Sequence, residues 1–145
     1  MTPTSLFVYG TLREAFGHPM HAALATRAQC IGKGFVRGEL YDLGDYPGLF
    51  PSFETDRRTF GEVYRFDPES EVEALSLLDA YEGCGPHDRQ PHEYVRKIVP
   101  CHLKEGSALE VWTYVLNRCP EWATLIPGGD YLAWKALKFS EAELV

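Results

Sequence analysis

The sequence has no long apolar run. None of its hydrophobic stretches approaches the ~20 consecutive apolar residues that a membrane-spanning helix requires. Its first ten residues, MTPTSLFVYG, also lack the basic segment and the extended apolar segment of a secretory signal peptide. These absences predict a cytoplasmic protein with no membrane partner, and the 145 residues suit a single domain spanning 1–145.

Positive charge is also scarce. The chain has 14 lysine and arginine residues against 21 aspartate and glutamate residues, which gives a net charge of −7. A protein that binds nucleic acid needs a basic surface to neutralise the phosphate groups. The charge balance therefore predicts that nucleic acid is not a partner.

Cysteine is sparse and unpatterned. The chain contains no C-x-x-C pair, and its four cysteines lie far apart, at Cys30, Cys84, Cys101 and Cys119. Zinc ribbons and thioredoxin-like redox sites both use closely spaced pairs. The spacing therefore supports neither a zinc nor a redox motif, and we expect reduced thiols in or near the core. No metal and no cofactor are predicted for this chain.

What is present is a series of short strand patterns with three helical patterns among them. The strands and helices do not alternate strictly, which indicates an α+β fold rather than a parallel α/β fold. A hairpin across KEGSA is expected to join the last two long strands. The predicted strands are 6–9, 32–44, 58–66, 93–103 and 109–116, with a short extended piece in 44–52, and the predicted helices are 18–29, 68–82 and 131–139.

The helix predicted over 68–82 has clear end signals. Asp67 is placed at the N-cap, Pro68 at the first helical position, and Gly83 just beyond the end. A helical wheel gathers its apolar residues into one arc. That arc contains Val72, Ala74, Leu75, Leu77, Leu78 and Tyr81.

Glu82 falls inside this arc, and Glu71 projects nearby but lies in the first turn, where an acid favours the helix N-terminus. On the wheel Glu82 projects between Leu75 and Leu78, so its carboxylate is expected to point inward. Burial and the negative end of the helix dipole both favour the protonated form, which is how enzymes raise the pKa of a catalytic glutamate. The alternative is that Glu82 leaves the last turn for solvent or pairs with an arginine.

The segment LFVYGTLR raises a second question, because a buried strand stops abruptly at Gly10. A glycine lets a ligand approach the backbone with no Cβ in the way. Successive free N–H groups in such a turn also suit a carboxylate or a developing oxyanion. The alternative is an ordinary turn at the end of a strand.

Several motifs together resemble the gamma-glutamylcyclotransferase-like family. VYGTLR and LLDAYEG are separated by about seventy residues, and GELYDLGDYPGLFPS, YVRKIVP and VWTYV follow the order of the family's strands. The resemblance covers nearly the whole chain. It implies a small mixed β-barrel with a few helices packed outside.

The resemblance also implies an activity and a set of site residues. In this family a gamma-glutamyl amide cyclises, because its alpha-amine attacks its own gamma-carbonyl and releases pyroglutamate (5-oxoproline) and a free amine. By this resemblance, Glu82 is the general base and then the general acid. Tyr9, Gly10, Thr11 and Leu12 bind the glutamyl group, and Tyr131 matches a tyrosine that contacts the substrate in some relatives. The amine that leaves, the role of the loop at 84–92 and the oligomeric state stay open.

Three other functions compete with this one. His18 and His21 lie three residues apart and could bind a metal. A cysteine hydrolase could use Cys84 or Cys101 with a histidine. The third alternative is a non-enzymatic module that binds a small molecule in the same barrel.

Tyr94 and Arg96 share one face of a predicted strand. The arginine could meet a substrate carboxylate, or it could form an ion pair at the protein surface.

Overall fold

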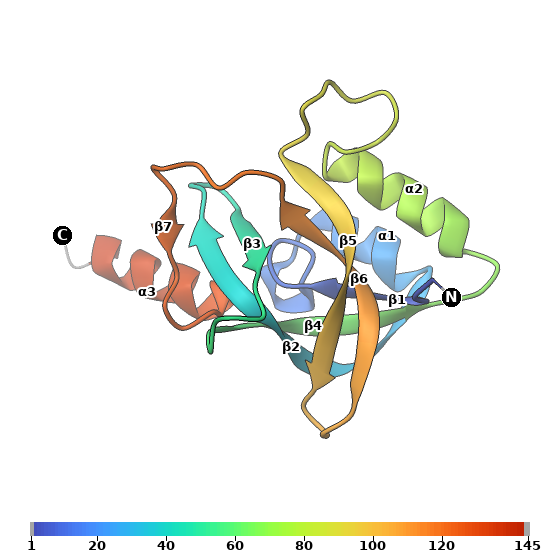
Figure 1. Cartoon of the computed structure of the whole chain (residues 1–145), viewed down its shortest axis with the longest axis horizontal. Coiled ribbons are helices and arrows are strands. Elements are labelled where there is room, and N and C mark those ends of the chain that lie inside the picture. Colours follow the sequence, from blue (N-terminus) through green and yellow to red (C-terminus); the bar gives the residue numbers. More distant parts are fainter. Residues whose placement is uncertain (1, 144–145) are drawn as a thin grey trace.

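The structure is a computed structural model, and it describes residues 2–143. These residues form seven strands, three α-helices and one 3₁₀ turn (Figure 1). No helix in the described part of the chain is long and apolar enough to cross a bilayer. The strands are β1 (Ser5–Val8), β2 (Ala28–Asp42), β3 (Pro47–Pro51), β4 (Arg58–Phe66), β5 (Tyr94–Leu103), β6 (Ala108–Leu116) and β7 (Thr124–Leu125), and the helices are η1 (Glu14–Phe16), α1 (Pro19–Ala25), α2 (Glu71–Tyr81) and α3 (Tyr131–Glu143).

The strands close into a small mixed barrel, so the predicted α+β fold is confirmed. β4 pairs with β1 and β2, β3 pairs with β2 and β6, and β6 returns to β1. The contacts of β6 with β1 and β3 are parallel, and the other pairings of this ring are antiparallel. β1 therefore has a neighbour on each side, which explains why all four of its side chains are buried.

Most of the predicted strands lie where the sequence pattern places them. β4 matches the expected range 58–66, and β5 and β6 form the expected hairpin. The glycines predicted to mark a bulge in β2 do so, since the pairing of β2 with β4 shifts register between Cys30 and Gly32. β7 was not predicted, because its two residues lie in a segment rich in proline and glycine.

α2 differs from its prediction at its N-terminus. The helix begins at Glu71 and not at Pro68, because residues 67–70 form a separate turn in which the Ser70 N–H donates to the Asp67 carbonyl. Its buried face is also narrower than the wheel indicates. Ala74 and Leu78 are buried, whereas Val72 is 84% exposed, since only the side of the helix toward α1 and the barrel is covered.

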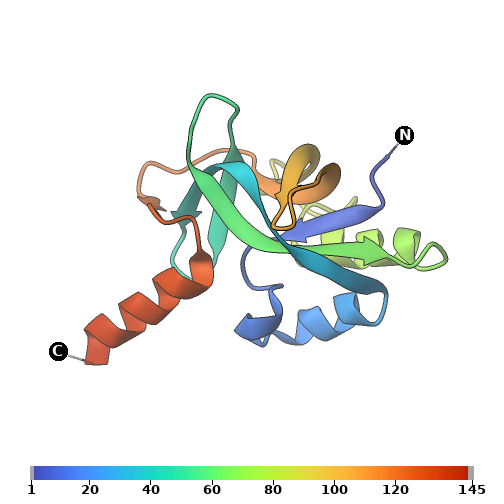
Figure 2. The ribbon, with the colours of Figure 1, turned by 90° about the horizontal axis from the view of Figure 1, so that it is seen from below.

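The helices lie outside the barrel, as Figure 2 shows most clearly for α3, which extends away from the strands. α2 is attached to the β5–β6 hairpin through Asp79. Its carboxylate accepts two hydrogen bonds from Arg96, at 2.8 and 3.2 Å, and one from the Tyr114 hydroxyl at 2.6 Å. These bonds fix the last turn of α2 against the barrel.

Candidate active site

A cavity of about 470 Å³ opens at the mouth of the barrel. It lies where the end of β1 meets the start of β3, the start of β5 and the C-terminal end of α2, all of which are visible in Figure 1. Four of the residues named from the resemblance line it in succession, Tyr9 to Leu12, and Glu82 lines it too. The structure therefore brings together two motifs that lie seventy residues apart.

Glu82 occupies the C-cap of α2, and Gly83 follows in the left-handed conformation with φ of 75°. The left-handed residue ends the helix and turns the chain away, so the Glu82 side chain is left facing the cavity. Its carboxylate has no hydrogen bond or ion pair with any other residue in 2–143. Glu82 therefore neither pairs with an arginine nor lies fully in solvent, which were the two alternatives considered above.

The environment of Glu82 makes it a weak acid. Burial raises the pKa of its carboxyl to about 7, and the nearby charge of Glu93 adds to the increase. A carboxyl with this pKa exchanges protons readily near neutral pH, which is the property required of a general base that later acts as an acid.

The loop after β1 is held against this carboxyl. The Thr11 hydroxyl lies 2.8 Å from the hydroxyl of Tyr81, the residue just before Glu82. Leu12 is only 4% exposed and packs into the core, so its side chain anchors the loop to the core. The hydrogen bonds of the described residues use none of the backbone N–H groups of Gly10, Thr11 and Leu12. These N–H groups are available to a ligand.

A packing contact that the sequence did not reveal explains why residue 10 is a glycine. A Cβ added at this position would lie 2.6 Å from Cγ of Pro47, closer than real side chains pack. The glycine thus allows the loop to pack against the start of β3. The prediction that it also lets a ligand approach the backbone is a separate matter and stays a prediction.

The tyrosines of the cavity wall are fixed by the barrel interior. The Tyr9 hydroxyl donates to the Tyr114 carbonyl at 2.6 Å and accepts from the Leu49 N–H at 3.2 Å. The Tyr94 hydroxyl donates to the Pro47 carbonyl at 2.5 Å. Burial raises the pKa of both phenols, so they stay neutral. They form a rigid, uncharged floor.

Tyr131 does not reach the cavity surface. Its side chain is fully buried, its hydroxyl lies 3.3 Å from the Asp45 carbonyl, and its ring stacks on Phe16. Asp45 and Phe16 line the cavity, whereas Tyr131 lies behind them. A direct contact with substrate would require this wall to move, and the contact stays a prediction.

The charge of the lining is negative. Among the described residues that line it are three carboxylates, from Asp45, Glu82 and Glu93, and neither lysine nor arginine. Arg96 is held by Asp79 and lies over the Trp112 ring at 4.2 Å, so it is part of the attachment of α2. The described lining therefore offers an anionic oxygen only uncharged donors, among them the unpaired N–H groups of Gly10, Thr11 and Leu12.

The residues of the competing functions have other partners, although His18 also lines the cavity beside Tyr81. The His18 Nδ1 accepts the Met20 N–H at 3.0 Å and so caps α1, and the His21 Nε2 lies 2.8 Å from the Tyr64 hydroxyl. Burial is the largest cause that raises the pKa of Cys84 to about 11, so this thiol is protonated and a poor nucleophile near neutral pH.

Burial raises the pKa of Cys101 to about 12, and the side chain is fully buried within β5. Like Cys84, it is absent from the cavity lining. These positions do not favour a cysteine hydrolase.

The sequence analysis missed a buried ion pair next to the loop. Arg13 Nε lies 3.2 Å from the Glu62 carboxylate, and both residues are less than a tenth exposed. A signal was present, because Glu62 shares its strand parity with the buried Tyr64 and Phe66. An acid at such a position requires a partner.

Comparison with known proteins gives the family. The model of the family described as "Gamma-glutamyl cyclotransferase, AIG2-like" matches residues 6–133. The gamma-glutamylcyclotransferase family protein YtfP of Escherichia coli (strain K12) is 36% identical over 128 residues, which cover 88% of this chain and 95% of that protein.

Two further relatives extend the comparison. Gamma-L-glutamyl-butirosin B gamma-glutamyl cyclotransferase of Niallia circulans is 32% identical over 116 residues, or 79% of this chain and 67% of that protein. The crystal structure of an AIG2-like protein from Mus musculus superposes with a TM-score of 0.69 at 25% identity, covering 90% of this chain and 89% of that one. This chain therefore belongs to the gamma-glutamyl cyclotransferase, AIG2-like family.

Proposed function

We propose that this protein is a gamma-glutamyl cyclotransferase that converts a gamma-glutamyl amide into 5-oxoproline and a free amine. The observation that carries the proposal is the single cavity shared by the Glu82 carboxyl and the free N–H groups of the loop after β1. Family membership and the names of the relatives support the same activity.

The substrate supplies its own nucleophile. Its alpha-amine attacks the gamma-carbonyl carbon, a new C–N bond closes a five-membered ring, and the original amide C–N bond breaks. An intramolecular reaction held in a near-attack geometry reaches effective molarities of about 10⁵ M or more. The protein therefore needs no nucleophilic side chain, and it acts by folding the glutamyl chain and moving one proton.

Glu82 moves that proton. Near neutral pH the alpha-amine is an ammonium group and cannot attack. The ionised Glu82 takes one proton from it, and the protonated Glu82 then gives that proton to the departing nitrogen. The ring nitrogen loses a second proton to water as the ring closes, which leaves the single N–H of 5-oxoproline. A pKa of about 7 is suited to both steps, because neither form is strongly disfavoured at neutral pH.

The loop after β1 holds an anionic oxygen. The N–H groups of Gly10, Thr11 and Leu12 suit the glutamyl carboxylate and the developing oxyanion equally, since each is a compact acceptor. The Thr11–Tyr81 hydrogen bond keeps this loop at a fixed distance from Glu82. The positions of base and anion site thus depend on each other.

The test is a panel of gamma-glutamyl compounds assayed for 5-oxoproline. The panel contains gamma-glutamyl amino acids, a gamma-glutamyl-lysine amide, glutathione and gamma-glutamyl-butirosin B, which the name of one relative suggests. At least one compound should be turned over. Binding of these compounds without any turnover would instead support the non-enzymatic binding module.

Glu82→Gln is the decisive variant. It removes the titratable proton but keeps the size of the side chain, so kcat should fall at least ~100-fold while the protein stays folded. Glu73→Gln is the matched control, because Glu73 lies on the same helix but pairs with Arg27 in solvent. A Glu82→Gln protein with more than about a tenth of the wild-type kcat would exclude the acid–base role.

A further inference from the structure

We propose that Glu62 is a positioning residue that holds the loop at residues 9–12 in its ligand-binding shape, acting through Arg13 and the backbone of Glu14. This inference rests on the function proposed above, because only that function requires the loop to bind a ligand. Glu62 lies outside the cavity lining, so it acts without touching the substrate.

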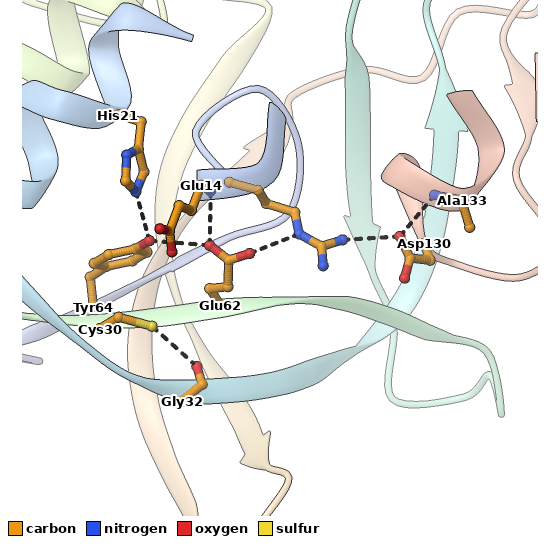
Figure 3. Close-up of polar contacts among 9 residues, drawn as sticks. Glu14, His21, Cys30, Gly32, Glu62, Tyr64, Asp130 and Ala133 are labelled. Carbon is orange, nitrogen blue, oxygen red and sulfur yellow. Dashed lines mark hydrogen bonds and ion pairs between the residues drawn. The ribbon is translucent and has the colours of Figure 1, made fainter. Parts of the chain in front are cut away.

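Glu62 meets the chain on both sides of the loop. In the barrel, its backbone pairs with Val8, the last residue of β1, just before the loop. Its side chain accepts the Arg13 Nε–H at 3.2 Å and the Glu14 N–H at 3.1 Å, just after the loop (Figure 3). One residue thus fixes the two ends between which Tyr9 to Leu12 must turn.

The other end of the arginine is also held. Arg13 Nη1 lies 3.0 Å from Oδ1 of Asp130, and the same oxygen accepts the Ala133 N–H at 3.2 Å in the first turn of α3. The rigid, planar guanidinium therefore bridges β4 and α3. It cannot rotate toward the cavity without losing one of these two partners.

Glu62 also accepts a third hydrogen bond. The Tyr64 hydroxyl donates to Oε1 of Glu62 at 3.1 Å. The Tyr64 hydroxyl has only this one proton to donate, so its oxygen accepts a hydrogen bond from the Nε2–H of His21, 2.8 Å away. Figure 3 shows this chain of contacts from α1 through β4 to α3.

Burial explains why this arrangement is stiff. Arg13 is 6% exposed and Glu62 is 7% exposed, so water cannot replace either partner if the ion pair is broken. A buried pair that loses one member leaves the other charge unpaired, which is strongly unfavourable. The loop is therefore held in one shape at the cavity wall, and its N–H groups have no protein partner among the described residues.

The test compares Glu62→Gln with Glu73→Gln, which alters an Arg–Glu pair that is exposed and remote from the loop. In Glu62→Gln, an amide NH₂ replaces one of the two accepting oxygens, and it cannot accept the N–H of Arg13 or of Glu14, whichever it faces. We expect kcat/KM to fall at least ~10-fold at a temperature where the variant is folded, as expected when reacting groups are misplaced. We expect little change in Glu73→Gln.

A second readout does not depend on turnover. The ¹⁵N order parameters of Thr11 and Leu12 should fall from about 0.85, typical of rigid backbone, toward 0.6 in Glu62→Gln but not in Glu73→Gln. If the wild-type protein turns over no gamma-glutamyl compound, the proposed function fails, and the order parameters alone decide whether Glu62 holds the loop.

Arg13→Lys covers the case in which Glu62→Gln does not fold. It keeps the charge, but one ammonium group cannot reach both Glu62 and Asp130 in the guanidinium's geometry. The same fall in kcat/KM and in order parameters is expected. Variants that lose thermal stability but keep kcat/KM within about twofold and keep both order parameters would overturn the proposal.

Discussion

Glu82 and Glu73 lie in the same helical segment, yet their carboxylates have opposite environments. Glu73 pairs with Arg27 in solvent. Glu82, nine residues later, faces a cavity whose described lining holds no lysine or arginine, and burial raises the pKa of its carboxyl to about 7. At the scale of a single residue, position in the fold and not residue type makes one glutamate a candidate base.

This pKa predicts the pH dependence of activity. Glu82 must be ionised to accept the ammonium proton, so kcat/KM should fall as the pH drops through about 7 and reach a slope of ~10-fold per pH unit. A pH profile of the wild-type protein measures this directly. An acidic limb centred near the pKa of an ordinary glutamate would contradict it.

Glu93→Gln tests the cause of the shift. The charge of Glu93 is the second contribution to the raised pKa of Glu82, so its removal should lower that pKa and move the acidic limb of kcat/KM to lower pH. The effect should be smaller than that of burial, which the variant leaves in place. Glu73→Gln, remote from the cavity, should leave the limb where it is.

At the scale of the element, the loop after β1 is shaped by its neighbours. Its side chains contact the core and Tyr81, and the Arg13 N–H donates to the Gly10 carbonyl at 3.0 Å to close the turn. Gly10 is required at the point where this turn passes Pro47. The element is therefore held by the core, by Tyr81 and by its own turn, while the N–H groups of Gly10, Thr11 and Leu12 have no partner among the described residues.

Gly10→Ala should consequently impair activity. Its Cβ would lie 2.6 Å from Cγ and 2.9 Å from Cδ of Pro47, so the loop must shift. We expect a loss of about 1–3 kcal/mol in the free energy of unfolding and a decrease of at least ~10-fold in kcat/KM. Urea denaturation and steady-state kinetics measure the two effects.

Gly128→Ala is the matched control for this prediction. A Cβ at Gly128 would meet nothing within 4 Å, so both quantities should change little. Equal effects of the two substitutions would show that the contact with Pro47 is not the reason for Gly10.

Element positions were largely predictable from the sequence. β4 and the β5–β6 hairpin lie where alternation and turn residues place them. The predicted start of α2 was wrong, because the helix-start signals at Asp67 and Pro68 are equally compatible with the turn that the chain forms there. Val72 was wrongly assigned to the buried arc, since a wheel does not reveal how wide a face the barrel covers.

At the scale of the whole molecule, the ionisation of Glu82 is linked to folding. Its pKa is raised in the folded protein, so the folded state binds more protons than the unfolded state between about pH 4.5 and 7. The stability contributed by the protonated group is complete below this range and is lost as the pH rises through about 7. The loss amounts to at most about 3 kcal/mol.

Glu82→Gln should remove this dependence. Relative to the wild-type protein, the variant should gain up to about 3 kcal/mol in the free energy of unfolding between pH 5 and pH 8, because it has no buried charge to form. Urea denaturation of both proteins at the two pH values measures the difference. A stability difference that is the same at both would show that Glu82 titrates normally.

The sequence by itself determined the order of the long strands and the α-helices and the abrupt end of the first strand, and it favoured an inward Glu82 without excluding the alternatives, because these follow from periodicity and turn chemistry within a few residues. Only the tertiary structure decided that Gly10 packs on Pro47, that Tyr131 lies behind the cavity wall, and that Glu62 pairs with Arg13. Each of these depends on partners that are distant in the chain, and strand register and barrel closure, not local pattern, bring such partners together.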